Sequence, residues 1–243
     1  KQMKTFMKIF LLAIILLSDV SMLSAQSIVW RKIIGGPRED ISYNCIESKD
    51  GGYLATGYKN ILPSGSMIYY AKSFITKFDR FGNILWDKII DDSLYTNSLS
   101  LTIIQDSIGN IYLPYTSTGG AYLAKLDPNG QLLWVKNYII NQILYFRGVS
   151  FVDNFKNLVL LSLNNFQGIY PTSDITKIDS SGNLIWTKPY YDSIPTLSFY
   201  TSHNNSFLFN ENSYFICGTK GNNPFILKTD TSGNIIWNKR YLD

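Results

Sequence analysis

The chain has 243 residues, of which 16% are charged and 15% aromatic, with a formal net charge of +4 and two cysteines. Much of the positive charge lies at the start of the chain, in Lys1, Lys4 and Lys8, so the remainder is nearly neutral and carries no basic footprint for nucleic acid. The abundance of Tyr, Ile, Thr, Ser, Asn and Gly is typical of β-rich proteins with many turns.

Residues 1–25 have the pattern of a signal peptide. Lys4 and Lys8 precede the apolar run 9–17, and small residues lead to Ser24-Ala25. This run is shorter than the roughly 20 residues that a membrane-spanning helix needs, but it suits an export signal. The alternative is an uncleaved N-terminal anchor. It is disfavoured because Asp19 and the polar stretch 18–24 end the apolar run early. We therefore expect a mature chain, 26–243, without a membrane span, that is secreted and extracellular or held at the cell surface.

A repeat of about fifty residues runs through the rest of the chain. All five tryptophans share one motif, Trp-x-Lys, at Trp30, Trp86, Trp134, Trp186 and Trp237. The last four follow the pattern Lys-x-Asp-x-x-Gly-[Asn/Gln]-apolar-apolar-Trp. Its aspartates are Asp79, Asp127, Asp179 and Asp230, and its glycines are Gly82, Gly130, Gly182 and Gly233. Chance does not place five of five tryptophans in this way, so the repeat is a property of the fold.

Each motif predicts a β-hairpin. Aspartate bonds to the backbone of its own turn, and glycine accepts the positive φ that closes such a loop. Alternation along the following strand places Ile84, Trp86 and Lys88 on one face. One large indole at a fixed place in each repeat is what packing between neighbouring sheets requires.

A second hairpin precedes each motif, as in the run from residue 41 through Lys49-Asp50-Gly51-Gly52 to residue 58. Four short strands in about fifty residues predict a blade of a β-propeller, with blades at about 41–88, 99–136, 148–188 and 204–239. A lone N-terminal strand is expected at 28–34. We expect an all-β protein and a fragment of a larger ring, of about six to eight blades. The alternative is a closed ring of four blades.

The Asp-x-x-Gly-x-x-x-Trp hairpin resembles the tryptophan-docking motif of pyrroloquinoline-quinone-type propellers, with a spacing one residue shorter and without the usual Thr before Gly. The sequence more closely resembles secreted repeat propellers of Bacteroidota, in which Trp-x-Lys, Asp50-Gly51-Gly52-Tyr53 and Lys77-x-Asp79-x-x-Gly82-Asn83 recur. The resemblance extends over nearly all of residues 28–240. It implies the fold and the compartment and assigns no activity.

The single histidine, His203, lies in a polar loop without the strand-turn-helix setting of a catalytic serine, so we expect an ordinary surface residue. One histidine and two distant cysteines do not make a zinc site. Cys45 and Cys217 interrupt apolar strands, which predicts two free buried thiols; a disulfide between them would require a ring closed by four blades.

The repeated aspartates suggest calcium loops at first sight, because Asp127-Pro128-Asn129-Gly130 resembles the start of one. The acidic residue that would close such a loop is missing, so turn formation is the better explanation. The three glutamates mark no glycosidase pair. We expect no catalytic residue, no metal and no cofactor in this chain.

Function is expected on the connections that vary between repeats, at 35–40, 59–72, 89–99, 116–121, 137–147, 164–173, 189–204 and 219–224. Their tyrosines, which form the expected binding face, are Tyr69, Tyr70, Tyr95, Tyr145, Tyr170, Tyr190 and Tyr191. Tyrosine stacks on sugars and anchors protein partners, although several of these rings are equally suited to covering neighbouring blades. The sequence therefore favours a non-catalytic binding or scaffold module for a protein or glycan. The alternative is a secreted glycan hydrolase or lyase whose catalytic residues lie outside this segment.

Overall fold

A computed structural model of the chain describes residues 30–90, 96–117, 120–138, 143–164, 172–190, 197–198, 207–210, 212–220 and 223–241. The chain divides into two compact units, Lys1–Ile33 and Ile34–Asp243. In the first unit only residues 30–33 are described; they form no strand, and Trp30 is 37% exposed. The expected signal peptide at 1–25 lies outside the described residues.

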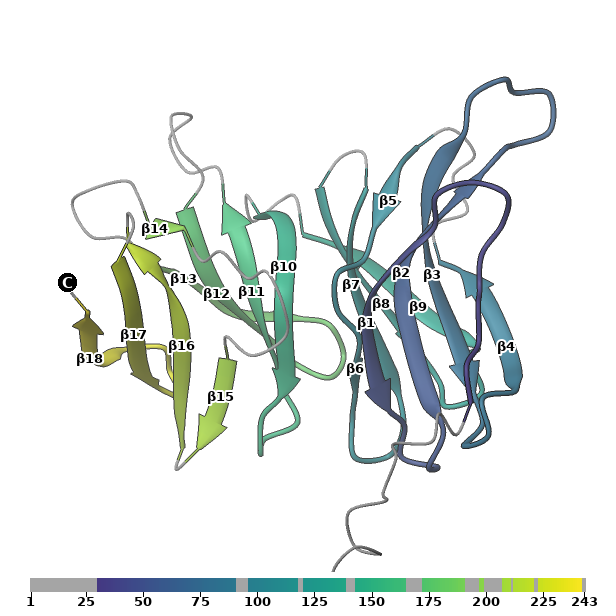
Figure 1. The fold of residues 1–243 in the computed structure, drawn as a ribbon. Coiled ribbons are helices and arrows are strands. Elements are labelled where there is room, and N and C mark those ends of the chain that lie inside the picture. Colours follow the sequence, from purple (N-terminus) through teal and green to yellow (C-terminus); the bar gives the residue numbers. More distant parts are fainter. Residues whose placement is uncertain are drawn as a thin grey trace, which may run out of the picture. The chain divides into compact units, whose positions relative to one another are not determined.

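The second unit confirms the predicted all-β class. Over its described residues the regular elements are strands that form four antiparallel sheets, each drawn in Figure 1 as a group of arrows in successive colours. The strands follow one another along the sheet in chain order, as a meander, which requires only short connections between neighbours.

The first sheet has the order β1-β2-β3-β4. Its strands are β1 (Ile41–Glu47), β2 (Tyr53–Ile61), β3 (Tyr70–Phe78) and β4 (Ile84–Ile89). The pair β2–β3 is in register over nine residues, from Tyr53 opposite Phe78 to Ile61 opposite Tyr70.

The second sheet has the order β5-β7-β8-β9, with β6 also paired to β7. Its strands are β5 (Ser98–Leu99), β6 (Ile104–Gln105), β7 (Ile111–Ser117), β8 (Gly120–Leu126) and β9 (Leu132–Asn137). Two short pieces therefore occupy the place of the single first strand that the sequence predicted.

The third sheet has the order β10-β11-β12-β13. Its strands are β10 (Ile143–Val152), β11 (Leu158–Asn164), β12 (Thr172–Ile178) and β13 (Leu184–Pro189). A register shift between Arg147 and Ser150 marks a bulge in β10.

The fourth sheet has the order β14-β16-β17-β18, with β15 also paired to β16. Its strands are β14 (Leu197–Ser198), β15 (Phe207–Asn210), β16 (Ser213–Lys220), β17 (Asn223–Asp230) and β18 (Ile235–Arg240).

Three apolar clusters join consecutive sheets. Leu54 and Ile75 of the first sheet pack with Leu113 of the second. In the next cluster Leu123 lies with Leu160 of the third sheet, and the last combines residues of the third and fourth sheets. Both faces of an inner sheet are thus buried, which explains the nearly continuous apolar runs in strands such as β7 and β11.

The predicted lone strand at 28–34 is wrong over its described residues, because residues 30–34 form no strand. A strand exists only where a neighbour satisfies its backbone groups, and none of the described strands pairs with this segment. Three expected connections are mostly strand as well. β7 and β8 take up 116–117 and 120–121, β9 and β10 take up 137 and 143–147, and β16 and β17 take up 219–220 and 223–224.

Candidate functional site

The meander brings two turns of every sheet to the same end. In the first sheet these turns join β1 to β2 and β3 to β4, while the β2–β3 connection lies at the opposite end. We call the end that carries these short turns the turn end. The second sheet follows the same plan with turns at 106–110 and 127–131, and the third with turns at 153–157 and 179–183.

One hydrogen-bond pattern makes these turns rigid. The Oδ1 atom of Asp179 accepts the backbone N–H groups of Ser181 and Asn183, at 2.9 and 2.8 Å, and its Oδ2 accepts the Asn183 side chain at 2.9 Å. The same backbone contacts occur at Asp79, Asp127 and Asp230, and at two aspartates that the repeat motif did not include, Asp106 and Asp153. At Asp79, Asp179 and Asp230 both carboxylate oxygens bond within their own turn, and at Asp79 the bond from Asn83 lowers the carboxyl pKa.

Three of the five indoles of the repeat, those of Trp86, Trp134 and Trp186, each lie on the turn glycine of the next sheet. A Cβ built on Gly130 would lie 2.8 Å from Cε2 of Trp86, and one on Gly182 would lie 2.7 Å from Cη2 of Trp134. The contact recurs between Gly233 and Trp186, with 2.9 Å to Cη2. Only glycine fits there, because the ring occupies the space of a side chain and φ is near +80° at all three glycines.

The lysine of Trp-x-Lys reaches the same turn. Lys136 Nζ donates to Oδ1 of Asn183 at 3.0 Å, and Lys188 Nζ donates to Oδ1 of Asn234 at 2.7 Å. In the first sheet Lys88 donates to the carbonyl oxygen of Gly130 instead. We call this combination of indole, lysine and turn the sheet lock.

Two sequence differences accompany the different target of Lys88: the turn that it faces carries Gln131 in place of the acceptor asparagine, and the residue four positions after the tryptophan also differs. There the second and third sheets carry Tyr138 and Tyr190, whose hydroxyls donate to the carbonyl oxygens of Gly182 and Gly233 at 2.9 and 2.6 Å. The first sheet has Ile90 at this place, which cannot donate. The glycine carbonyl is therefore open to the lysine only where the tyrosine is missing.

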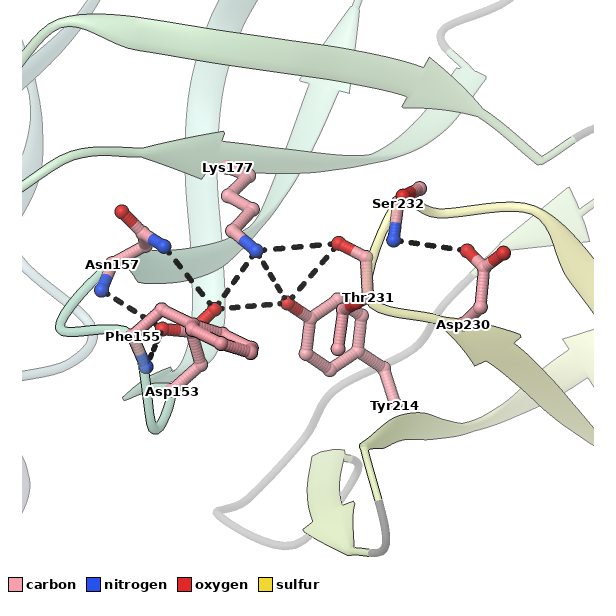
Figure 2. A network of polar contacts seen from close by, with 8 residues as sticks. All are labelled: Asp153, Phe155, Asn157, Lys177, Tyr214, Asp230, Thr231 and Ser232. Atoms are coloured by element: carbon pink, nitrogen blue, oxygen red, sulfur yellow. Dashed lines mark hydrogen bonds and ion pairs between the residues drawn. The ribbon is translucent and has the colours of Figure 1, made fainter.

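A second polar link crosses from the third to the fourth sheet (Figure 2). Lys177 Nζ lies 2.9 Å from Oδ2 of Asp153 and 3.0 Å from the hydroxyl of Tyr214, which itself lies 3.1 Å from the same Oδ2 atom. Lys177 also donates to the carbonyl oxygen of Thr231 in the next turn, at 3.2 Å. The side chains of Lys177 and Asp153 are 8% and 0% exposed, so the ion pair is buried.

Hydrogen bonds in this network keep the Asp153 carboxyl group charged. Burial acts to raise the pKa of Asp153, but hydrogen bonds from Lys177 and from the backbone of Asn157 outweigh it, and the pKa lies below its usual value. Burial, with Asp153 nearby, raises the pKa of Tyr214, so its hydroxyl stays protonated. Every charged atom of the network is used inside the protein, which makes it a support for the two sheets and leaves no base or nucleophile facing solvent.

Apolar side chains protrude from three rigid turns at the turn end. Phe81 is 63% exposed, Ile108 73% and Phe155 61%, and each stands two residues after its turn aspartate. The guanidinium of Arg80 lies 4.6 Å from the ring centre of Phe81. The turn between β1 and β2 contacts β6 of the next sheet, where Lys49 N donates to Gln105 Oε1 at 2.8 Å. These three residues were not predicted as site residues. The available signal was an apolar residue at a position where other turns have Asn129, Ser181 or Ser232.

The predicted tyrosine face is only partly described. Tyr95, Tyr170 and Tyr191 lie outside the described residues, and for Tyr145 in β10 only the backbone is described. Tyr70 begins β3, and the half-buried Tyr69 carries the guanidinium of Arg38 at 4.7 Å from its ring centre.

Tyr190 corrects the prediction of a tyrosine binding face. This ring is 5% exposed and its hydroxyl serves the sheet lock, so it is a packing residue and does not belong to a binding surface.

The cysteines are free, but the expectation that they are buried was wrong. Cys45 and Cys217 are both exposed. Cys45 lies in the edge strand β1, where an apolar neighbour in the sequence does not imply burial on both faces. Partial burial still raises the pKa of the Cys45 thiol, which disfavours the reactive thiolate. His203 lies outside the described residues.

Within the described ranges, no three His, Cys, Asp or Glu side chains gather into a group suited to a metal ion. The described part of the chain also contains no helix with the length and apolar character that crossing a bilayer requires.

No family model matches the chain, and no curated protein matches it. It is similar to a solved structure described as a crystal structure of the eukaryotic initiation factor, with 10% identity, a TM-score of 0.40 and coverage of 82% of this chain. The chain spans only 55% of that protein. A luciferin-regenerating enzyme matches with 10% identity and a TM-score of 0.43, over 82% of this chain and 72% of its own. The succession of four-stranded antiparallel sheets in this chain is compatible with a β-propeller-like all-β fold.

Proposed function

We propose that the chain is part of a secreted or cell-surface β-propeller that acts as a non-catalytic binding or scaffold module for a protein or glycan partner. In this proposal each sheet is a blade, the unit belongs to a larger ring of the kind found in Bacteroidota repeat proteins, and residues 1–25 direct export.

The observation that carries the proposal is the recurrence of the sheet lock. Trp86, Trp134 and Trp186 each fix the next sheet through a turn that its own aspartate has already made rigid. A scaffold stiffened in this way holds the surface side chains of different sheets at fixed mutual positions, which lowers the entropic cost of binding.

In this proposal, the surface that binds the partner lies at the turn end. Phe81, Ile108 and Phe155 project from three turns, and an exposed ring or branched apolar side chain on a rigid backbone is a suitable anchor for a sugar face or a protein pocket. The connections at the opposite end differ between sheets and remain a second source of contacts.

The test uses the exported chain as bait against a glycan array and against surface proteins of the source cell. A triple variant, Phe81→Ser, Ile108→Ser and Phe155→Ser, should lose the captured partner. The matched control changes three exposed apolar residues of the outer strands, Leu85→Ser, Leu133→Ser and Ile185→Ser, which are 57%, 50% and 47% exposed, and should retain it.

A glycan-hydrolysis screen on the same preparation completes the experiment. Turnover of a glycan by the chain would overturn the non-catalytic assignment in favour of a hydrolase or lyase. Equal loss of the partner in both triple variants would remove the turn end as the binding surface.

A further inference from the structure

The β2–β3 connection carries no charged residue and exposes several apolar ones. It runs from residue 62 to residue 69, between Ile61 of β2 and Tyr70 of β3 (Figure 1). Leu62 is 44% exposed, Met67 98% and Ile68 62%, so three apolar side chains of one short connection face solvent together. We call these three residues the apolar tip.

The tip has a defined backbone. Ser66 N donates to the carbonyl oxygen of Pro63 at 3.0 Å, and Gly65 takes a φ of +79°. The Ser66 hydroxyl accepts the backbone N–H of Ile68 at 3.0 Å and donates to the carbonyl oxygen of the same residue at 3.0 Å. These bonds satisfy the backbone N–H groups of Ser66 and Ile68 and the carbonyl oxygens of Pro63 and Ile68 within the turn, which reduces the cost of removing these groups from water.

The polarity of the side chains changes in a fixed order from the end of this hairpin toward the sheet. Behind the apolar tip stands Tyr69, whose ring carries the guanidinium of Arg38 at 4.7 Å. Among the described residues, the acidic residues Glu39 and Asp40 contact Asn60, which directly precedes Ile61 at the end of β2. Asp40 Oδ1 accepts Asn60 N at 2.8 Å. No acidic residue occurs in the sequence between Asp50 and Asp79.

We infer that the apolar tip inserts into the surface of a lipid bilayer and holds the chain against it. Apolar residues at the end of a convex turn, then tyrosine and arginine, then acidic groups reproduce the order of environments from acyl chains through headgroups to water. The lack of acidic residues in the sequence of the hairpin arms and tip, between Asp50 and Asp79, suits the negative surface potential of biological membranes.

Strand topology then orients the molecule. The β2–β3 connection lies at the end of the first sheet opposite its turns, so a tip in the bilayer directs the turns of that sheet away from the membrane. This inference goes beyond the proposed binding function, which requires no lipid.

The experiment measures cosedimentation of the full chain with phosphatidylcholine vesicles, with and without phosphatidylglycerol. The double variant Met67→Asp, Ile68→Asp should lower the partition coefficient at least about tenfold, because it places two charges where acyl chains are expected. The matched control, Ile108→Asp with Phe155→Asp, alters two exposed apolar residues at the turn end and should change the partition coefficient less than about twofold. All variants keep the N-terminal apolar run, so differences between them report on the tip.

A dye at residue 67 gives a second readout. Met67→Cys in a Cys45→Ser, Cys217→Ser background is labelled with an environment-sensitive fluorophore, whose emission should shift to the blue on addition of vesicles. The same label on Ile108→Cys should not shift. Absence of vesicle binding, binding that the double variant retains, or an unshifted label at residue 67 each overturns the inference and leaves the glycan and protein capture tests untouched.

Discussion

The indole of Trp134 lies so close to Gly182 of the next sheet that a Cβ on this glycine would be 2.7 Å from the ring and 2.8 Å from Cδ of Lys136. The tryptophan and the glycine of the repeat are therefore one structural unit, shared between consecutive sheets. Neither residue of a pair can change without affecting the other sheet.

Gly182→Ala is expected to destabilise the protein by about 2–4 kcal/mol, since it combines left-handed backbone strain with overpacking against the indole. Gly65→Ala is the matched control, because Gly65 has a similar φ of +79° but nothing within 4 Å of the added Cβ. It should cost about 1 kcal/mol. Urea unfolding followed by circular dichroism measures both, and equal costs would contradict the sheet lock.

The lysines of the sheet lock should contribute unequally to the free energy of unfolding. Lys88→Met removes the donor to a glycine carbonyl that no tyrosine serves, and should cost about 1 kcal/mol. Lys136→Met removes a bond to an exposed asparagine while Tyr138 keeps the carbonyl of Gly182 bonded, and should cost less than about 0.5 kcal/mol.

Tyr138→Phe provides the converse test of the same idea. It should cost about 1 kcal/mol alone, and Lys136→Met added to it should then cost more than in the parent, because the lysine becomes the remaining donor near that carbonyl. Additive costs for the two changes would show that the lysine and the tyrosine do not share the turn.

Much of this architecture was predictable from sequence, for a physical reason. A turn aspartate, a positive-φ glycine and an indole at fixed spacing are local requirements, and local requirements leave a pattern that one sequence displays. The four sheets, their hairpins and the pairing of strands follow from it. Burial does not, because it depends on neighbours distant in sequence: Tyr190 resembled a surface ring and is buried, whereas Cys45 and Cys217 resembled core residues and are exposed.

The same distinction explains the candidate site. Phe81, Ile108 and Phe155 share a turn position, which the sequence contains, but that they project into solvent depends on the aspartate bonds beneath them. The link between Lys177 and Tyr214 joins residues of different repeats, and nothing in either repeat alone indicates it.

The buried ion pair of the third sheet should shape the response to acid. The pKa of Asp153 is lower in the folded protein than in the unfolded chain, so its contribution to stability is present above the unfolded pKa of about 3.9 and is lost as the pH falls through the folded value. Asp153→Asn should therefore flatten the acid limb of the stability profile. Asp50→Asn, which changes an ion pair whose carboxylate is 60% exposed, should leave that limb nearly unchanged.

Breaking the pair from the other side gives a larger effect at neutral pH. Lys177→Met leaves the carboxylate of Asp153 buried with Tyr214 and its own turn as donors, and should cost about 3–5 kcal/mol. Chemical unfolding at pH 7 measures this cost. A loss below about 1 kcal/mol would mean that the buried pair contributes no more than a surface pair.

One turn carries a strain that a single substitution should relieve. Lys156 has a φ of 64° and donates its N–H to the carbonyl oxygen of Asp153 at 2.9 Å, a turn position that Gly51 and Gly109 occupy in the first two sheets. Its side chain is exposed, so glycine loses no packing there. Lys156→Gly should stabilise the protein by about 0.5–1 kcal/mol, measured as a higher urea midpoint with an unchanged slope.

Asn212→Gly changes the other non-glycine residue with positive φ among the described residues. It should stabilise the protein less, because asparagine tolerates this conformation better than lysine does. A lower midpoint for Lys156→Gly would show that the lysine side chain contributes contacts that outweigh its backbone strain.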